Sequence, residues 1–142
     1  MNPSPFEPAH LNESVFAVPP LARDASLKVS RVENEKIIRF LESGGVRSLL
    51  YGGNAVFYHI QLREYAEVLS MLADTASADT VVVPSIGPAF GFAIDQVEVL
   101  RDHDFPTVMV LPSRNWPVTL FTIGASALGG TSGDRVCREV AA

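Results

Sequence analysis

The chain has 142 residues, nearly half of them apolar, and a formal net charge of −5. This length predicts one domain with a buried core, and the acidic balance argues against a nucleic-acid-binding protein, which normally carries a basic stripe. No run of about 18 apolar residues predicts a membrane span, and the polar, proline-rich start lacks the features of a secretory signal. We therefore expect a cytoplasmic protein that binds neither nucleic acid nor membrane.

The residues that metal sites use most are few and scattered. A single cysteine, Cys137, cannot form an internal disulfide. His10, His59 and His103 show no metal-ligand spacing with it or with one another. Neither a phosphate-binding P-loop nor a dinucleotide fingerprint is present. The sequence therefore predicts no metal site and assigns no organic cofactor.

Short apolar strands and helices alternate along the chain from residue 13 to residue 112. The preceding residues, 1–12, are polar and rich in proline, which predicts a flexible N-terminal arm. After this arm the predicted elements are, in chain order, a strand at 13–18, a helix at 31–42, a strand at 46–51, a helix at 62–76, a strand at 79–84, a helix at 93–102 and a strand at 106–112.

Local signals support these elements. Ser30 followed by Glu33 is a capping-box pattern at the start of the first helix. Apolar residues recur at steps of three and four along 62–76, which is typical of an amphipathic helix. The strands at 79–84 and 106–112 are unbroken apolar runs, which indicates burial on both faces, as in a parallel sheet.

Three of these strands are followed by helices at a repeat of about 30 residues, the size of a βα unit. Alternating strands and helices predict an α/β fold with a parallel sheet. Right-handed crossovers place the loops that follow the strands on one edge, where such folds form their sites. Gly52, Gly53 and Asn54 follow the second strand, where glycine lets the backbone approach a ligand. A tight turn without a ligand is the alternative for this loop.

Several stretches together resemble the N-terminal half of the dihydrodipicolinate synthase / N-acetylneuraminate lyase family. They are Val18-Pro19 at a strand end, "ESGGV", the glycine loop, "REYAEVL", "VVVPSIG" and "VMVLP". The resemblance covers residues 13–112 and implies a partial (β/α)8 TIM barrel of about four βα units. It also implies a class I aldolase-type lyase or synthase, which forms a Schiff base between a lysine and a small 2-keto acid and needs no metal or organic cofactor.

The same resemblance implies a set of substrate-binding residues. The Gly-Thr-Thr-Gly-Glu motif of the family falls on 52–56, so Gly52 matches while Gly53 and Asn54 replace the threonines that hold the keto-acid carboxylate. Gly87 matches the glycine of the loop after the third strand, and Ser113 stands where the family has its proton-relaying tyrosine. Backbone N–H groups and the Asn54 amide can still bind a carboxylate.

No lysine of this chain matches the Schiff-base lysine, which the family carries near the end of the sixth strand. Lys28 and Lys36 are the only lysines, one in the loop after the first strand and one in the first predicted helix. Neither has neighbours in sequence that would desolvate the amine and lower its pKa. We therefore assign no catalytic residue and expect this chain alone to be inactive.

Residues 113–142 do not continue the βα repeat, although 118–123 is compatible with a further strand. We interpret them as a divergent, non-barrel tail that arose by truncation or a frame shift. A half barrel exposes two strand edges, so we expect a homo-oligomer, or coverage of one edge by 118–123. The alternative reading of the whole chain is a non-catalytic α/β module that binds an anionic metabolite or a partner protein at the same loops.

Overall fold

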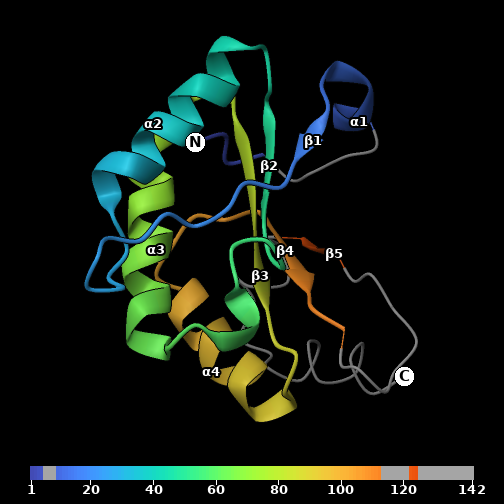
Figure 1. The fold of residues 1–142 in the computed structure, drawn as a ribbon. Coiled ribbons are helices and arrows are strands. Elements are labelled where there is room, and N and C mark those ends of the chain that lie inside the picture. Colours follow the sequence, from blue (N-terminus) through green and yellow to red (C-terminus); the bar gives the residue numbers. More distant parts are fainter. Residues whose placement is uncertain (5–8, 113–121, 125–142) are drawn as a thin grey trace.

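The computed structural model describes residues 1–4, 9–112 and 122–124, and it contains a single five-stranded sheet with strand order β1-β2-β3-β4-β5. The strands are β1 (Phe16–Ala17), β2 (Ser48–Tyr51), β3 (Val81–Ile86), β4 (Thr107–Val110) and β5 (Thr122–Gly124). The first four run parallel, and β5 is antiparallel to β4. Helices lie along one face of this sheet (Figure 1). The predicted parallel βα arrangement is therefore confirmed, and the sheet is open rather than closed into a barrel.

After a short first helix, which was not predicted, the helices follow the strands in the predicted order. They are the short α1 (His10–Glu13), α2 (Arg31–Ser43), α3 (Leu62–Thr75) and α4 (Phe90–Leu100), with a 3₁₀ turn, η1 (Phe57–His59), before α3. The bounds of α2 and α3 agree with the prediction to within one residue. Helix α4 begins at Phe90 instead of residue 93, because Ala89, whose backbone is extended, is its N-cap residue. The first strand is shorter than predicted, since Glu13 belongs to α1 and Ser14 follows as its C-cap.

The start of α2 uses half of the predicted capping box. The Ser30 hydroxyl accepts a hydrogen bond from the Glu33 N–H at 3.4 Å, as expected of an N-cap. The Ser30 N–H donates instead to the Ala22 carbonyl at 3.0 Å, and the Glu33 carboxylate pairs with Lys36 at 2.7 Å. The chain before α2 is therefore fixed to the helix through backbone contacts.

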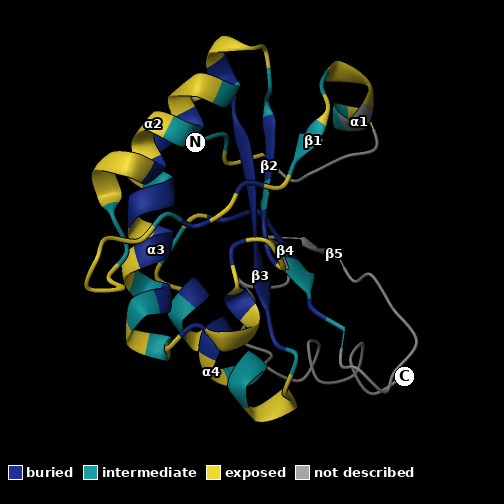
Figure 2. Ribbon diagram, viewed as in Figure 1, coloured by how far each residue is buried: buried dark blue, intermediate teal, exposed yellow. Residues whose placement is uncertain are grey.

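The core lies between the sheet and its helix layer. Burial colouring shows buried strands, and helices that are buried where they face the sheet and exposed elsewhere (Figure 2). Successive side chains of a strand point to opposite faces, so alternate residues of β2, β3 and β4 reach the helices. The strand residues of this core are Leu49, Tyr51, Val82, Ile86 and Val108, and their partners on α3 and α4 include Tyr65, Leu69, Leu72, Val97 and Leu100.

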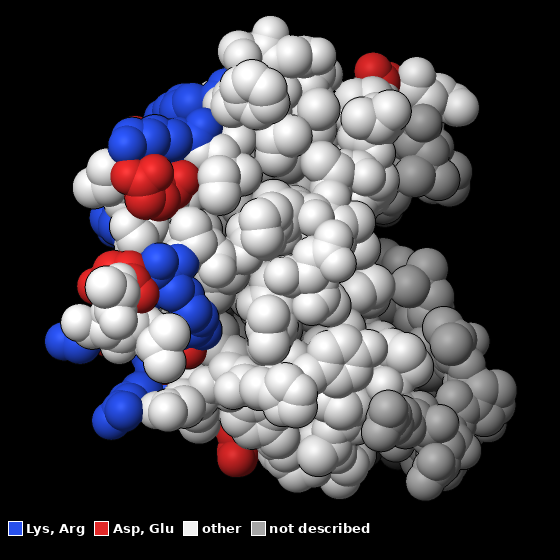
Figure 3. Space-filling view, viewed as in Figure 1, with Lys and Arg blue, Asp and Glu red and all other residues white. Residues whose placement is uncertain are grey.

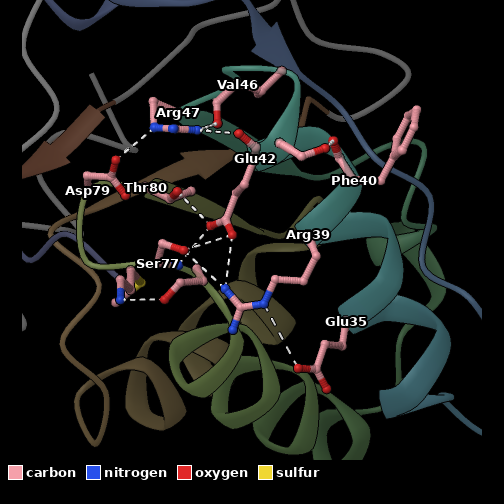
Figure 4. Close-up of polar contacts among 12 residues, drawn as sticks. Glu35, Arg39, Phe40, Glu42, Val46, Arg47, Ser77, Asp79 and Thr80 are labelled. Atoms are coloured by element: carbon pink, nitrogen blue, oxygen red, sulfur yellow. Dashed lines mark hydrogen bonds and ion pairs between the residues drawn. The ribbon is translucent and has the colours of Figure 1, made fainter.

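A polar cluster fixes the amino-terminal end of the sheet to α2 (Figure 4). The nearly buried Glu42 carboxylate accepts hydrogen bonds from the Ser77 N–H and hydroxyl, from the Thr80 hydroxyl and from Arg39, at 2.7–3.1 Å. Burial alone would raise the pKa of Glu42, but these hydrogen bonds together outweigh it and lower the pKa. Arg47 extends the cluster by pairing with Asp79 at 2.8 Å. This end of the sheet is therefore built for stability.

The two edges of the described sheet differ. Strand β5 pairs with β4 through Thr107, Val108 and Met109, and so covers the β4 edge. The sequence led us to expect that 118–123 would cover one edge; Thr122 and Ile123 lie in β5, whereas 118–121 lie outside the described residues. Strand β1 pairs with β2 and forms the other edge of the described sheet.

The first residues of the chain contact the turn before β3. The Met1 amino group donates to the Ala76 carbonyl at 2.8 Å, and the Asn2 N–H donates to the Thr80 carbonyl at 2.9 Å. These contacts anchor the beginning of the segment that was expected to be a flexible arm. The flexibility of residues 1–12 as a whole stays a prediction.

Candidate functional site

The carboxyl ends of β2, β3 and β4 meet at Gly52, the first residue after β2. A β-carbon built on Gly52 would lie 2.7 Å from the Ser85 Oγ of β3 and 2.9 Å from the Met109 Cε of β4. Both distances are shorter than real carbon contacts, so a side chain at this position would collide with its neighbours. A larger residue at Gly52 would therefore have to displace the side chains of Ser85 and Met109.

The loop after Gly52 is a compact turn. The Val56 N–H donates to the Gly53 carbonyl at 3.0 Å, and the Phe57 N–H donates to the Gly52 carbonyl at 3.2 Å. Val56 has a left-handed backbone, with φ 59°, which is strained for a β-branched residue. Strain of this kind is retained only where the surrounding structure determines the conformation.

Two consecutive backbone donors of this turn have no partner in the part of the chain that the structure describes. Among the described residues, no hydrogen bond involves the backbone N–H of Asn54 or of Ala55. The Asn54 side chain donates to the Val18 carbonyl at 3.0 Å, which fixes the turn to the end of β1. Successive N–H groups in a turn form a concavity suited to an anion. The loop can therefore offer hydrogen-bond donors to a small carboxylate.

An aromatic cluster holds the loop on the core. The buried Phe57 ring lies between Tyr51 of β2, at 6.4 Å between ring centroids, and Tyr65 of α3, at 5.7 Å in an edge-to-face arrangement. Burial raises the pKa of both tyrosine hydroxyls, which therefore stay protonated at neutral pH. Tyr58 and His59, the other residues of η1, are exposed.

The loop after β3 brings Gly87 close to the same strands. Gly87 is buried, has φ 88°, and donates its N–H to the Gln96 side chain of α4 at 2.7 Å. A β-carbon built on Gly87 would lie 3.4 Å from the Leu111 carbonyl, and one built on Gly52 would lie 3.6 Å from the Leu111 side chain. The structure therefore gathers Gly52 and Gly87 around Leu111, while Ser113 lies outside the described residues.

Two polar residues of this region were not among the predicted site residues. Ser85 and Gln96 are both fully buried, and in the described part of the chain the Ser85 hydroxyl and the Gln96 Nε2 have no hydrogen-bond partner. The sequence signal for Ser85 is a hydroxyl within the apolar strand "VVVPSI". Gln96 has a similar signal, as an amide on the buried face of the apolar helix α4.

The loop between β1 and α2 is held by polar contacts. The buried Asn34 side chain exchanges hydrogen bonds with the backbone of Ala22 at 2.9 Å each way. Arg23 forms a bidentate ion pair with Glu64 of α3, and the hydrogen bond that its guanidinium donates to the Glu64 carboxylate raises the pKa of Arg23. Lys28 in this loop is exposed, and Lys36 on α2 is exposed and paired with Glu33. Both lysines are therefore solvated rather than enclosed.

A mainly apolar groove of about 690 Å³ runs between the end of β1 and the outer side of α2. Its lining comes from Ala17, Val18, Pro19, Pro20, Ala22, Glu33, Lys36, Ile37, Phe40 and Leu41. The Phe40 side chain is 77 % exposed there. In the space-filling view, charged side chains gather towards α2 and α3, and the centre of the face is uncharged (Figure 3).

Neither a metal cluster nor a membrane-spanning helix is found in the part of the chain that the structure describes. In that part, no group of three or more His, Cys, Asp or Glu residues is placed to hold a metal ion. None of its helices is long and apolar enough to cross a bilayer.

Comparison with solved structures identifies the fold. The chain is similar to dihydrodipicolinate synthase from Rhodopseudomonas palustris, with a TM-score of 0.62 and 17 % identity over 71 % of this chain and 34 % of that one. For dihydrodipicolinate synthase from Oceanobacillus iheyensis the TM-score is 0.59, and the identity is 19 % over 74 % of this chain and 35 % of that one. The chain is also similar to YagE, a prophage protein of the dihydrodipicolinic acid synthase family from E. coli K12 in complex with pyruvate. The TM-score is 0.62, and the identity is 16 % over 75 % of this chain and 37 % of YagE.

At these identities the likeness establishes the fold, which is a partial TIM barrel with an open sheet. The expected resemblance to dihydrodipicolinate synthase structures is therefore confirmed, and the matched region spans only about a third of the length of those proteins. No protein-family model and no curated protein sequence matches the chain.

Proposed function

We propose that the chain corresponds to the N-terminal βα units of a dihydrodipicolinate synthase-like, cytoplasmic protein, and that its β2–η1 loop binds the carboxylate of a small 2-keto acid. One observation carries this proposal: the backbone N–H groups of Asn54 and Ala55 have no partner among the described residues and lie at the carboxyl edge of a parallel sheet. The pyruvate complex of YagE, a protein of the same fold, supports the choice of ligand.

The chemistry of the loop fits a carboxylate. A carboxylate accepts hydrogen bonds only, and the two backbone N–H groups donate only. The Asn54 amide adds a further N–H, because its Nδ2 carries two hydrogens and the Val18 carbonyl occupies one of them. Because Val18 and Phe57 fix the turn from both sides, these donors are held in place before the ligand arrives.

Catalysis by this chain alone is not part of the proposal. A Schiff-base reaction needs a neutral amine in an enclosed pocket, and Lys28 and Lys36 are both exposed. We propose that lyase chemistry of the aldolase type, where it occurs, depends on an amine supplied by further βα units. Borohydride reduction in the presence of pyruvate tests this directly: no adduct should form on either lysine, and a trapped adduct would contradict it.

A thermal-shift comparison tests ligand binding. Pyruvate at millimolar concentration should raise the melting temperature of the full chain, whereas acetone, which has the keto group without the carboxylate, should not. An equal shift with both compounds, or none with pyruvate, would contradict the proposed carboxylate site. Asn54→Ala should reduce the pyruvate shift, because it removes one N–H donor and the contact with Val18.

A non-catalytic binding module is the second candidate, and the groove beside α2 is the observation that favours it. The β4 edge is covered by an antiparallel β5, so the described strands do not form an entirely parallel sheet. The groove instead suggests self-association. We propose that a second copy occupies it, because most of its lining is apolar and the Phe40 side chain is exposed in it, and a two-fold axis would bring the same surface of two copies together.

A further inference from the structure

The β2–η1 turn has open space beside it, over Gly53. Apart from its chain neighbours, the described residues place one atom within 4 Å of a β-carbon built on Gly53, the Tyr58 Cε2 at 3.8 Å. Gly53 is exposed, and its backbone lies outside the left-handed region that favours glycine. An alanine would therefore fit at this position, whereas at Gly52 a β-carbon would lie 2.7 Å from the Ser85 Oγ.

Tyr58 forms one wall of this space and is held there by the backbone of the turn. The Val56 N–H donates to the Gly53 carbonyl and the His59 N–H donates to the Val56 carbonyl, both at 3.0 Å, so η1 folds back onto the start of the turn. The neighbouring Phe57 is buried and anchors η1 on the core. The Tyr58 side chain is 36 % exposed, so a ligand in this space can reach it.

The part of the Tyr58 ring that faces the space is the end that carries the hydroxyl, because Cε2 is bonded to the same ring carbon as the phenol oxygen. A phenol can donate one hydrogen bond, and the edge of an aromatic ring carries partial positive charge. The Asn54 N–H belongs to the peptide that follows Gly53 directly, so a proposed carboxylate donor borders the same space. A ligand there therefore meets two different kinds of donor side by side.

We propose that the keto end of the 2-keto acid occupies the space over Gly53, where the Tyr58 hydroxyl donates a hydrogen bond to the keto oxygen. In a 2-keto acid the keto carbon is bonded directly to the carboxyl carbon, so this oxygen lies next to the carboxylate bound by the Asn54 and Ala55 N–H groups. Tyr58 thus distinguishes a 2-keto acid from a simple carboxylic acid. This inference rests on the proposed function.

The first test compares Tyr58→Phe with the unchanged full chain in NMR titrations with pyruvate and with propionate, which has the same carbon count and no keto oxygen. Tyr58→Phe keeps the ring and removes only the hydroxyl. It should weaken pyruvate binding about 5- to 10-fold, the loss expected for one neutral hydrogen bond, and leave propionate binding unchanged. His59→Ala, at the next exposed position of η1, is the control and should bind both ligands normally.

The second test fills the space itself. Gly53→Ala should weaken pyruvate binding about 10-fold or more, because its β-carbon takes the place of the keto end. Without ligand it should melt at the same or a higher temperature, since the new β-carbon makes only an ordinary contact with Tyr58 and alanine has less freedom to lose on folding. Gly91→Ala is the matched control: a β-carbon on Gly91, in α4, has no described atom within 4 Å beyond its own helix turn and chain neighbours, and pyruvate binding should not change.

The outcomes separate this inference from the proposed function. Equal pyruvate affinity in Tyr58→Phe and the unchanged chain would overturn the role of the hydroxyl, and equal losses for pyruvate and propionate would overturn the keto assignment. Unchanged pyruvate affinity in a stably folded Gly53→Ala would overturn the placement of the keto end; if that variant is destabilised, Tyr58→Phe, at an exposed position, decides. No pyruvate binding by the unchanged chain would overturn the proposed function as well.

Discussion

Glu42 accepts two hydrogen bonds from Ser77, one from its backbone N–H and one from its hydroxyl, each 2.8 Å long. This pair joins the end of α2 to the turn between α3 and β3, two segments that are far apart in the sequence (Figure 4). Its position at the amino end of the strands keeps it away from the proposed ligand site. Contacts at the amino ends of the strands thus stabilise the fold, while the loops at the carboxyl ends carry the proposed ligand site.

Replacing Glu42 by Gln should lower the free energy of unfolding at pH 7 by about 1–3 kcal/mol, because buried donors lose a charged acceptor. The pKa of Glu42 is lowered in the folded state, so its contribution is complete above the unfolded pKa of about 4.3 and is lost as the pH falls through the folded value. In urea unfolding between pH 3 and 7, the free energy of unfolding should therefore fall more steeply with decreasing pH for the unchanged chain than for Glu42→Gln. Glu35→Gln, at an exposed position, should match the unchanged chain, and equal acid slopes for Glu42→Gln and the unchanged chain would refute this account.

Val56 offers a stabilising substitution. Its left-handed backbone is strained for a β-branched residue and is tolerated by asparagine, and its side chain is half-exposed. Val56→Asn should therefore raise the free energy of unfolding by about 1 kcal/mol in denaturant titrations. The same change at Val32, an exposed position within α2, should give no gain. A destabilised Val56→Asn would show that the turn depends on contacts of the valine side chain.

Phe57 should be the main anchor of the loop. Phe57→Ala removes a fully buried ring between Tyr51 and Tyr65, so the free energy of unfolding should fall by about 3–5 kcal/mol. The exposed Phe90 provides the control, because Phe90→Ala should cost less than about 0.5 kcal/mol. Calorimetry or denaturant unfolding measures both, and similar losses at the two positions would contradict the aromatic cluster as the anchor.

The groove beside α2 makes a prediction about self-association. Light scattering should find an oligomer of the full chain at micromolar concentration, and Phe40→Glu should shift it to monomer by placing a charge in the apolar groove. Phe90→Glu, on the exposed side of α4, should leave the oligomer intact. A monomeric unchanged chain would contradict the proposed second copy in the groove.

The sequence predicted the elements best where local chemistry and packing agree. Helix α2 begins at its serine cap, and α3 follows its apolar stripe, so both were placed to within a residue. Strand β1 was predicted too long, because an edge strand is paired on one side only and its ends are set by neighbouring segments rather than by its own residues. Helix α4 starts before its predicted position because Gly91, which reads as a loop residue, is accommodated in the first turn.

The site was harder to predict than the fold. The glycine loop could be located from its place after a buried strand, but the contact between Gly52 and Ser85 depends on the register of β2 and β3, which no local pattern specifies. The buried state of Glu42 has the same origin, since nothing in its local sequence separates it from the exposed Glu35. Long-range pairing therefore decides which polar residues become functional or structural.

The central claim is that backbone donors of the β2–η1 loop bind the carboxylate of a 2-keto acid, and amide NMR of the full chain during a pyruvate titration tests it most directly. We expect saturable shifts of the Asn54 and Ala55 amide signals. The amide signal of Ser77, which donates to Glu42 at the opposite end of the strands, should not change comparably. Signals of Asn54 and Ala55 that stay unchanged at saturating pyruvate, or that move no more than the Ser77 signal, would contradict it.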